Sequence, residues 1–183
     1  DSGALSLTRS LVSGSSGEGV RSSSGAISVV NSTLSGNEVG IIASTSVVTI
    51  DASTITLSQD EGIEGSTPAI TITNSILAGN SPNCGVAITS AQFTMSSDAS
   101  CNLVGSGNRP STNPLLGPLA NNGGPTLTHL PQPGSPAIDA GSNALCQAVD
   151  QRGVARPVDG DGDGTATCDM GAVEAAAGVT PPP

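Results

Sequence analysis

The triplets Leu5-Ser6-Leu7, Ile27-Ser28-Val29, Val48-Thr49-Ile50 and Ile70-Thr71-Ile72 repeat one apolar–polar–apolar pattern. Their first residues lie 22, 21 and 22 positions apart. Within each triplet the alternation is that of a β-strand, whose successive side chains point to opposite faces. A strand that recurs with such a period is typical of a coil that stacks on copies of itself. The pattern therefore predicts an all-β fold, a right-handed parallel β-helix.

Three further columns follow nearly the same period: Ser10, Ser32, Ser53 and Ser75; Val12, Leu34, Ile55 and Leu77; and, more loosely, Val20, Ile41, Ile63 and Val86. We therefore expect two or three short strands in each coil, joined by turns that contain Gly, Ser and Asn. A fifth, degenerate coil is expected around Phe93-Thr94-Met95. The polar stretches Ser13–Ser24 and Gln59–Ser66 are interpreted as mobile loops.

The organisation along the chain changes after the repeats. Residues 1–108 are the predicted β-helix region, and residues 109–174 are rich in proline, which breaks long elements. We interpret 109–174 as an irregular, disulfide-bound cap that covers the last coil, because a coil stack exposes backbone and apolar surface at its end. Residues 175–183 end in three prolines and are interpreted as an extended tail or linker. The chain itself reads as a mature or excised fragment.

Composition limits the possible partners. The chain of 183 residues has 15 acidic side chains against 5 Arg and no Lys, and its net charge is −10. Nucleic-acid binding requires a basic surface, so we expect no nucleic-acid partner. No apolar stretch is long enough to span a bilayer. An acidic, Ser- and Gly-rich surface suits a secreted protein that stays soluble.

Four cysteines, Cys84, Cys101, Cys146 and Cys168, permit three disulfide pairings. Pairing of sequence neighbours, Cys84 with Cys101 and Cys146 with Cys168, closes short loops outside the regular repeat. A zinc site is disfavoured because the chain has no CxxC pair and one His, His129. Two disulfides predict an oxidising, extracellular compartment.

The C-terminal part contains four motifs: PLLGPLANNGGPTLTHL (114–130), GSPAIDAG (134–141), DQRGVARP (150–157) and CDMGAVE (168–174). Together they resemble the choice-of-anchor Q family of bacterial surface or secreted proteins. That resemblance implies an extracellular right-handed parallel β-helix, normally followed by a variable cell-surface sorting signal. It implies no established enzymatic activity.

The acidic run from Asp159 to Gly164 predicts a calcium site. Asp159, Asp161 and Asp163 occupy the first, third and fifth positions of a calcium loop, with Gly164 at the sixth. The twelfth position holds Met170 instead of an acid, so Asp169 or Glu174 is the substitute ligand. The alternative is a solvated acidic turn held by a Cys146–Cys168 bridge.

Other chemistry has little support in the sequence. A polysaccharide-cleaving enzyme is a distant alternative, because the repeat region has acids but the chain has no Lys and almost no aromatic side chains to stack on sugars. No Gly-x-Ser-x-Gly motif accompanies His129, which is interpreted as a structural or surface residue. The pairs Thr54-x-Thr56 and Thr71-x-Thr73 fall in different columns, so we expect no threonine ladder of the kind that binds ice.

The function that we expect from these observations is structural rather than catalytic. Almost nothing precedes the first predicted coil at Leu5, so that coil has an exposed strand edge. Such an edge predicts head-to-tail self-association into a filament, stalk or surface layer. The alternative is a cell-surface adhesin that binds a partner, of unknown identity, through Ser13–Ser24 and Gln59–Ser66.

Overall fold

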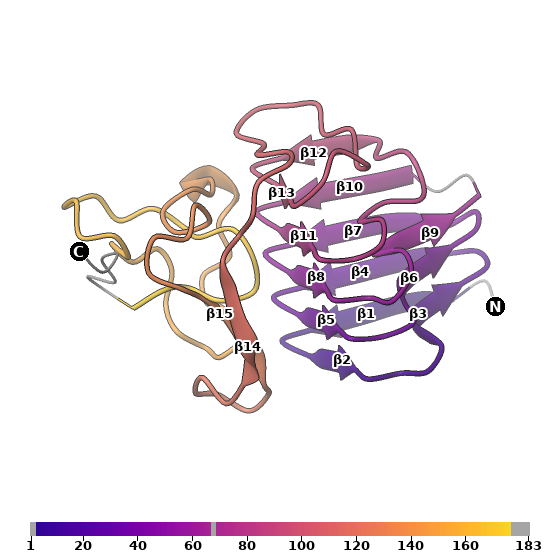
Figure 1. Ribbon diagram of the computed structural model, residues 1–183, viewed down its shortest axis with the longest axis horizontal. Helices are drawn as coiled ribbons and strands as arrows, with labels where there is room; N and C mark the ends of the chain where they lie inside the picture. Colours follow the sequence, from indigo (N-terminus) through magenta and orange to yellow (C-terminus); the bar gives the residue numbers. More distant parts are fainter. Residues whose placement is uncertain (1–2, 67–68, 177–183) are drawn as a thin grey trace.

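The computed structural model describes residues 3–66 and 69–176. Within these ranges the chain contains no α-helix, and its parallel strands stack into a β-solenoid of about four turns (Figure 1). The predicted all-β, parallel β-helix architecture is therefore confirmed.

Three parallel sheets form the walls of the solenoid. Sheet A has the order β1-β4-β7-β10-β12, with β1 (Ala4–Thr8), β4 (Ala26–Val30), β7 (Val47–Asp51), β10 (Ala69–Thr73) and β12 (Ser90–Gln92). Sheet B has the order β13-β11-β8-β5-β2, with β2 (Leu11–Ser13), β5 (Thr33–Ser35), β8 (Thr54–Thr56), β11 (Ile76–Ala78) and β13 (Met95–Ser96). Sheet C has the order β3-β6-β9, with β3 (Glu18–Ser22), β6 (Val39–Ala43) and β9 (Ile63–Gly65).

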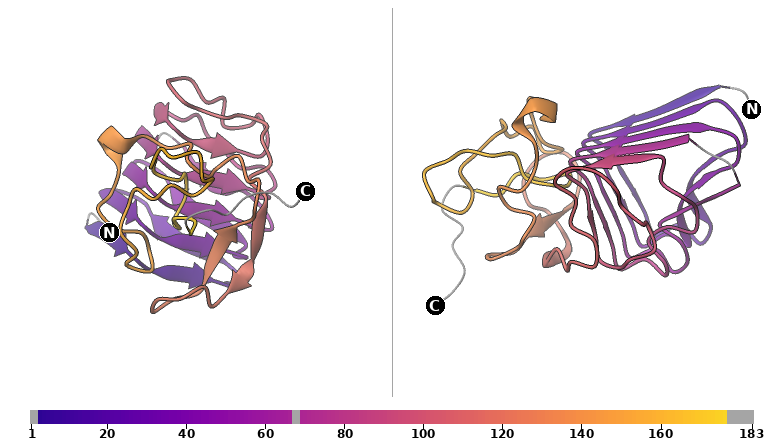
Figure 2. Two further views of the ribbon diagram at one scale, coloured as in Figure 1. Left: turned by 90° about the vertical axis from the view of Figure 1, so that its left-hand side faces the viewer. Right: turned by 90° about the horizontal axis from the view of Figure 1, so that it is seen from above.

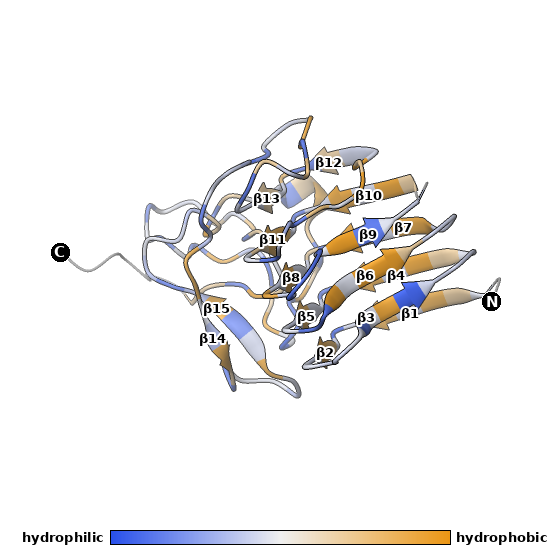
Figure 3. Ribbon diagram, turned by 45° about the vertical axis from the view of Figure 1, so that its right-hand side comes forward, coloured by the Kyte–Doolittle hydropathy of each residue, from blue (hydrophilic) through white to orange (hydrophobic). Residues whose placement is uncertain are grey.

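The repeat period sets the register of the strands. In sheet A, Leu5 pairs with Ile27, Ile27 with Val48, and Val48 with Ile70, as the triplets predict. Of these side chains, Ile27, Val48 and Ile70 belong to one core cluster of buried residues. Figure 3 shows hydrophobic residues along β4, β7 and β10. The degenerate fifth coil is also present, because β12 and β13 lie on either side of Phe93.

One residue in the left-handed conformation turns each coil from sheet A into sheet B. These residues form a column with φ between 43° and 49°: Arg9, Asn31, Ala52, Asn74 and Phe93. The predicted Ser column follows directly, and each backbone N–H donates to the Ser Oγ of the next coil. Ser10 N donates to Ser32 Oγ, Ser32 N to Ser53 Oγ, and Ser53 N to Ser75 Oγ, each at 3.1 Å. This ladder satisfies buried backbone groups at the corner, where no sheet pairing is available.

The stretches that we interpreted as mobile loops each contain a strand, so that interpretation is wrong. Ser13–Ser24 includes β3, and Gln59–Ser66 includes β9. Both pair with β6, because Val20, Ile41 and Ile63 are one buried column of the core. Burial of these three side chains stabilises sheet C, the third wall of the solenoid. The polar residues around them make its strands difficult to recognise in the sequence.

The last coil is covered by residues 97–112, here called the end segment. Ser96 N donates to Arg109 O, Arg109 N donates to Thr94 O, and Phe93 N donates to Ser106 O. The disulfide between Cys84 and Cys101 joins the end segment to the residue that pairs with Ile63 of β9, at the end of the fourth coil.

The rest of the chain, residues 113–176, is here called the C-terminal region. It contains the antiparallel pair β14 (Leu116–Ala120) and β15 (Thr128–Pro131) and a short 3₁₀ helix, η1 (Asn143–Leu145). We expected 109–174 to cover the last coil, but the C-terminal region packs along the side of the solenoid (Figures 1 and 2). It contacts the first coil through Arg9, the second through Thr33 and the fourth through Asn74.

The lateral position of the C-terminal region follows from the composition of sheet B. All three residues of β5, β8 and β11 are buried, so the sheet has no solvent-facing side at these strands. The outward hydroxyl of Thr33 donates to Gln151 Oε1 at 2.6 Å, and that of Thr54 accepts from Ala172 N at 3.0 Å. Near the last coils the outward residues Ile76 and Ala78 pack on Met170. The outward hydroxyl and apolar side chains of sheet B thus provide contacts for the C-terminal region from the second coil to the fourth.

The predicted tail, 175–183, lies mostly outside the described residues. Ala175 belongs to the packed part of the chain: it is buried, and its N–H donates to Asp169 Oδ2 at 2.5 Å.

Candidate functional site

The outer edges of β1, β2 and β3, here called the first-coil face, are the first candidate site. Each strand lies at one end of its sheet, and among the described residues none has a partner on its outer side. Leu5 on β1 is 38% exposed, whereas its equivalents Ile27, Val48 and Ile70 are at most 1% exposed. At the first-coil face the inward-pointing side chain of Leu5 is therefore partly exposed, whereas the equivalent side chains in β4, β7 and β10 are covered.

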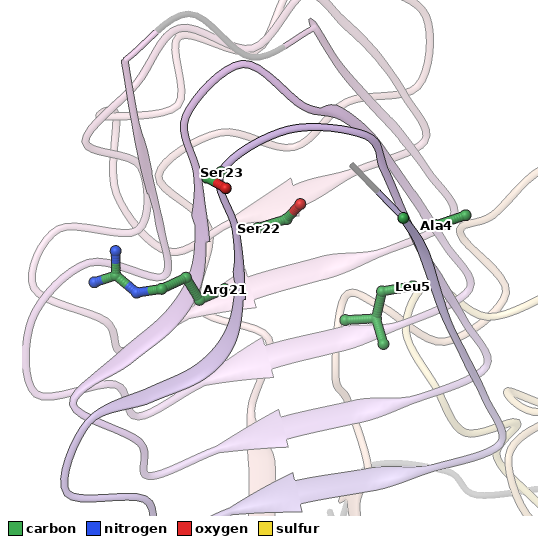
Figure 4. Close-up of a pocket in the computed structure, with 6 residues that line it drawn as sticks. Ala4, Leu5, Arg21, Ser22 and Ser23 are labelled. Carbon is green, nitrogen blue, oxygen red and sulfur yellow. The ribbon is translucent and has the colours of Figure 1, made fainter. Parts of the chain in front are cut away.

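A shallow cavity of about 370 Å³ opens at this face, lined by Gly3, Ala4, Leu5, Arg21, Ser22 and Ser23. Figure 4 shows Leu5 and Ser22 pointing toward one another across the opening, while Arg21 points away. The Arg21 guanidinium hydrogen-bonds Glu18 and holds the pKa of that carboxyl below its usual value. The cavity offers one apolar side chain, hydroxyl groups and strand edges, a set that suits another strand.

The acidic loop, Asp159–Gly164, is the second candidate. Carboxylate oxygens of Asp139, Asp159 and Asp161 lie within 4.8 Å of one another. Asp159 accepts hydrogen bonds from Gly162 N at 2.7 Å and Gly164 N at 2.9 Å, so the loop folds around this side chain. Burial, and to a lesser extent the charge of Asp161, raise the pKa of Asp139.

The structure unites only two of the four predicted calcium ligands. Asp159 and Asp161 belong to the cluster, and Asp163 lies outside it, where its carboxylate accepts from Thr165 N at 2.7 Å. Asp139 was missed because it lies 20 residues before the loop (159 − 139). In the sequence, Asp139 could have been noticed as the acidic residue of the motif GSPAIDAG. Calcium binding by this loop stays a prediction.

Asp169 lies in a separate buried ionic cluster. Its carboxylate accepts hydrogen bonds from Asp139 N and Ala175 N. Next to it, Arg156 Nη1 lies 3.2 Å from Glu174 Oε2, with both side chains at most 1% exposed. Burial, together with the charge of Glu174, raises the pKa of Asp169 to about 7. The prediction of Asp169 as a ligand beside Asp159 and Asp161 is not supported by this geometry, because its two carboxylate oxygens already accept backbone N–H groups of the C-terminal region.

His129 has a structural position, as expected. It is buried between β5 and β14, with Nδ1 2.7 Å from Gly117 O and Nε2 2.8 Å from Ser35 Oγ. The short contact to a carbonyl assigns the proton to Nδ1. Nε2 then accepts from the Ser35 hydroxyl. Burial lowers the pKa of His129 and favours this neutral form.

Both predicted disulfides, Cys84–Cys101 and Cys146–Cys168, are present. The second joins residues near η1 to the strand-free segment that carries Asp169. Among the described residues, no helix has the length and apolar character that a membrane crossing requires.

No protein-family model, no curated protein and no solved structure matches this chain. The resemblance to the choice-of-anchor Q family therefore stays a prediction.

Proposed function

We propose that this chain is an extracellular structural module that associates through its first-coil face. The observation that carries the proposal is the exposure of Leu5, whose equivalents in the next three coils, Ile27, Val48 and Ile70, are buried. A solenoid with two disulfides is compatible with an extracellular structural protein. Absence of enzymatic activity stays a prediction.

The two ends of the solenoid differ, and this affects the expected mode of association. A head-to-tail filament needs the outer edge of the last coil, where the end segment already bonds to Phe93, Thr94 and Ser96. At the first-coil face, by contrast, no described strand pairs with the outer edges of β1, β2 and β3. Contact between identical faces is closed by a two-fold axis and produces pairs, whereas head-to-tail contact produces fibres. We therefore propose pairs rather than the filament that the sequence suggested.

Strand addition at this face has a physical basis. The outer N–H and C=O groups of β1 are available for pairing. Covering the exposed part of Leu5 contributes about 1 kcal/mol from apolar burial. Antiparallel pairing of β1 with its copy adds backbone hydrogen bonds, each of about 1 kcal/mol net. The association is therefore expected to be weak and dependent on concentration.

Sedimentation velocity of Leu5→Asp against the parent chain tests the proposal. A charge on an inward position of an edge strand blocks strand addition. Val104→Asp is the matched control, because Val104 is 79% exposed and lies on the end segment. We expect pairs for the parent chain and Val104→Asp, and single copies for Leu5→Asp.

The structure gives less support to the alternative function as an adhesin. Both stretches proposed to capture a partner contain strands of sheet C, which leaves shorter loops for recognition. Partner capture through them stays a prediction.

A further inference from the structure

The antiparallel pair β14 and β15, with the turn between them, is here called the hairpin, and it lies against the side of the solenoid (Figure 1). One side chain of the hairpin, that of His129, joins it to the second coil. His129 Nδ1 lies 2.7 Å from Gly117 O on β14, and His129 Nε2 lies 2.8 Å from Ser35 Oγ on β5. A single imidazole ring therefore bridges a strand of the hairpin and a strand of the solenoid.

The bridge suits a neutral ring. The register between β14 and β15 shifts between Leu116 and Leu119, so Gly117 has no opposite residue in the pairing, and the ring gives its carbonyl a donor. The second nitrogen accepts from the Ser35 hydroxyl. The side chains of Ser35 and His129 are both buried, so each polar atom depends on the other.

A protonated ring does not suit the same bridge. Imidazolium carries an N–H on both nitrogens and has no acceptor. Its Nε2 must then donate to Ser35 Oγ, and the hydroxyl hydrogen of Ser35 loses the acceptor that it has in the neutral state. The ring would also hold a buried positive charge, which is costly unless a carboxylate lies next to it.

No carboxylate of the packed strands faces the ring. β14 and β15 contain no charged side chain, and neither do β5 and its neighbours β2 and β8. Burial lowers the pKa of His129, and the hydrogen bond to Gly117 O offsets only part of this effect. The surroundings of the ring therefore favour release of its proton.

The charged groups of the neighbouring segment give the ring no counter-ion either. Arg152 Nη1 donates to Asn122 O in the turn of the hairpin at 3.1 Å, and Arg152 Nη2 lies 2.8 Å from Asp150 Oδ2. Asp150 is thus already paired. Arg9 Nε donates to the backbone oxygen of Gln151 at 3.2 Å and adds a second cation to this interface.

The remaining polar contacts of the hairpin are made by groups that do not titrate. Gln151 Nε2 donates to Thr126 Oγ1 at 2.9 Å and to Leu127 O at 3.4 Å. His129 is the one histidine of the chain, and residues 114–131 contain no acid. Within the hairpin, only His129 gains a proton in mildly acidic solution.

We propose that the hairpin is an acid-sensitive latch: when His129 takes up a proton, β14 and β15 detach from β5 while the coils stay stacked. In the detached state water solvates the imidazolium. Leu116 of β14 also lines a cavity of about 420 Å³ with Thr56 and Leu57 of the solenoid, so detachment opens this cavity. The coils keep their parallel pairing, in which the hairpin takes no part.

Hydrogen–deuterium exchange of the disulfide-intact protein, corrected for the chemical exchange rate at each pH, tests the latch. Because detachment takes up one proton, the fraction of detached hairpin rises up to tenfold for each pH unit below the ordinary His pKa of 6.5. We expect peptides within 116–131 to exchange about tenfold faster at pH 5 than at pH 7.5, and peptides within 26–56 to keep their rate.

The matched variant is His129→Asn. Its amide can donate to Gly117 O but cannot be protonated, so its hairpin should exchange equally at the two pH values. The ring of His129 in the parent chain gives a second readout by NMR, which does not depend on the folding of any variant. We expect the ring to titrate with a midpoint below 6.5, together with the change in exchange.

A ring that titrates at or above 6.5 overturns the proposal, and so does equal acceleration in His129→Asn. Acceleration of the whole solenoid at pH 5 overturns it as well, because the acid effect is then global unfolding. Asp169→Asn should keep the response of the hairpin, since protonation of Asp169 favours the folded state and acts in the opposite direction. Leu5→Asp should also keep it, so the latch does not depend on the pairing of two first-coil faces.

Discussion

Ser53 offers the sharpest test of the stacked corner. It lies in the middle of the Ser column, and both Ser53 and its neighbour Ser32 are fully buried. Ser53 Oγ accepts from Ser32 N at 3.1 Å and donates to Asp51 O at 2.7 Å. The substitution Ser53→Ala removes both bonds, together with the longer one that Ser53 Oγ donates to Val29 O at 3.2 Å. Asp51 O keeps a donor, because Asn31 N also donates to it at 3.1 Å.

We expect most of the free-energy cost to come from the Ser32 N–H, the buried donor that loses its acceptor. In Ser53→Ala the buried Ser32 N–H has no acceptor, and such an unsatisfied donor costs about 1–3 kcal/mol. For a chain of this length, a loss of about 2 kcal/mol lowers the Tm by about 4–8 °C.

Urea unfolding of the disulfide-intact protein measures this cost as a shift in midpoint at unchanged m. The matched control is Ser10→Ala. Ser10 Oγ donates to Thr8 O on the surface, and among the described residues no backbone N–H donates to it. We expect a change below about 0.5 kcal/mol for the control. Equal effects of the two substitutions would refute the assignment of the Ser column as a ladder that satisfies buried backbone.

Three further predictions concern the core, the buried ionic cluster and the acidic loop. Ile55→Ala, at a fully buried position, should lower the unfolding free energy by about 2–5 kcal/mol in urea titrations. The pKa of Asp169 is raised from 3.8 to about 7 in the folded state, so protonation of this carboxyl favours folding. The unfolding free energy of the parent chain, relative to that of Asp169→Asn, should therefore fall as pH rises from about 4 to about 7 and level off above that. A flat difference contradicts the burial argument. In calorimetry, the double variant Asp159→Ala with Asp161→Ala should lose calcium binding, and the single variant Asp163→Ala should keep it. An equal loss in both variants contradicts a calcium site formed by Asp139, Asp159 and Asp161.

The repeat region could be predicted because its signal is local and periodic. Leu5, Ile27, Val48 and Ile70 pair in register since each recurs with the coil, and strand alternation decides which side chain faces the core. The column of Val20, Ile41 and Ile63 was recognised, but the stretches that contain β3 and β9 were interpreted as loops, because Val20 and Ile63 are single buried residues among polar neighbours.

The position of the C-terminal region could not be predicted, because its contacts join residues far apart in the chain. Thr33 and Gln151 meet across 118 residues, and neither is apolar. The cluster of Asp139 with the acidic loop depends on the same folding of an irregular chain. Motif spacing predicted Asp159 and Asp161, which the structure brings together, and also Asp169, which lies in the buried ionic cluster; spacing alone does not show which side chains are buried.

The most direct measurement of the central claim is the molar mass of the chain in solution as a function of concentration. An uncovered first coil predicts a reversible increase from one copy to two that Leu5→Asp abolishes and Val104→Asp preserves. A single copy at the highest soluble concentration, for the parent chain, would contradict the claim that this face binds a second molecule.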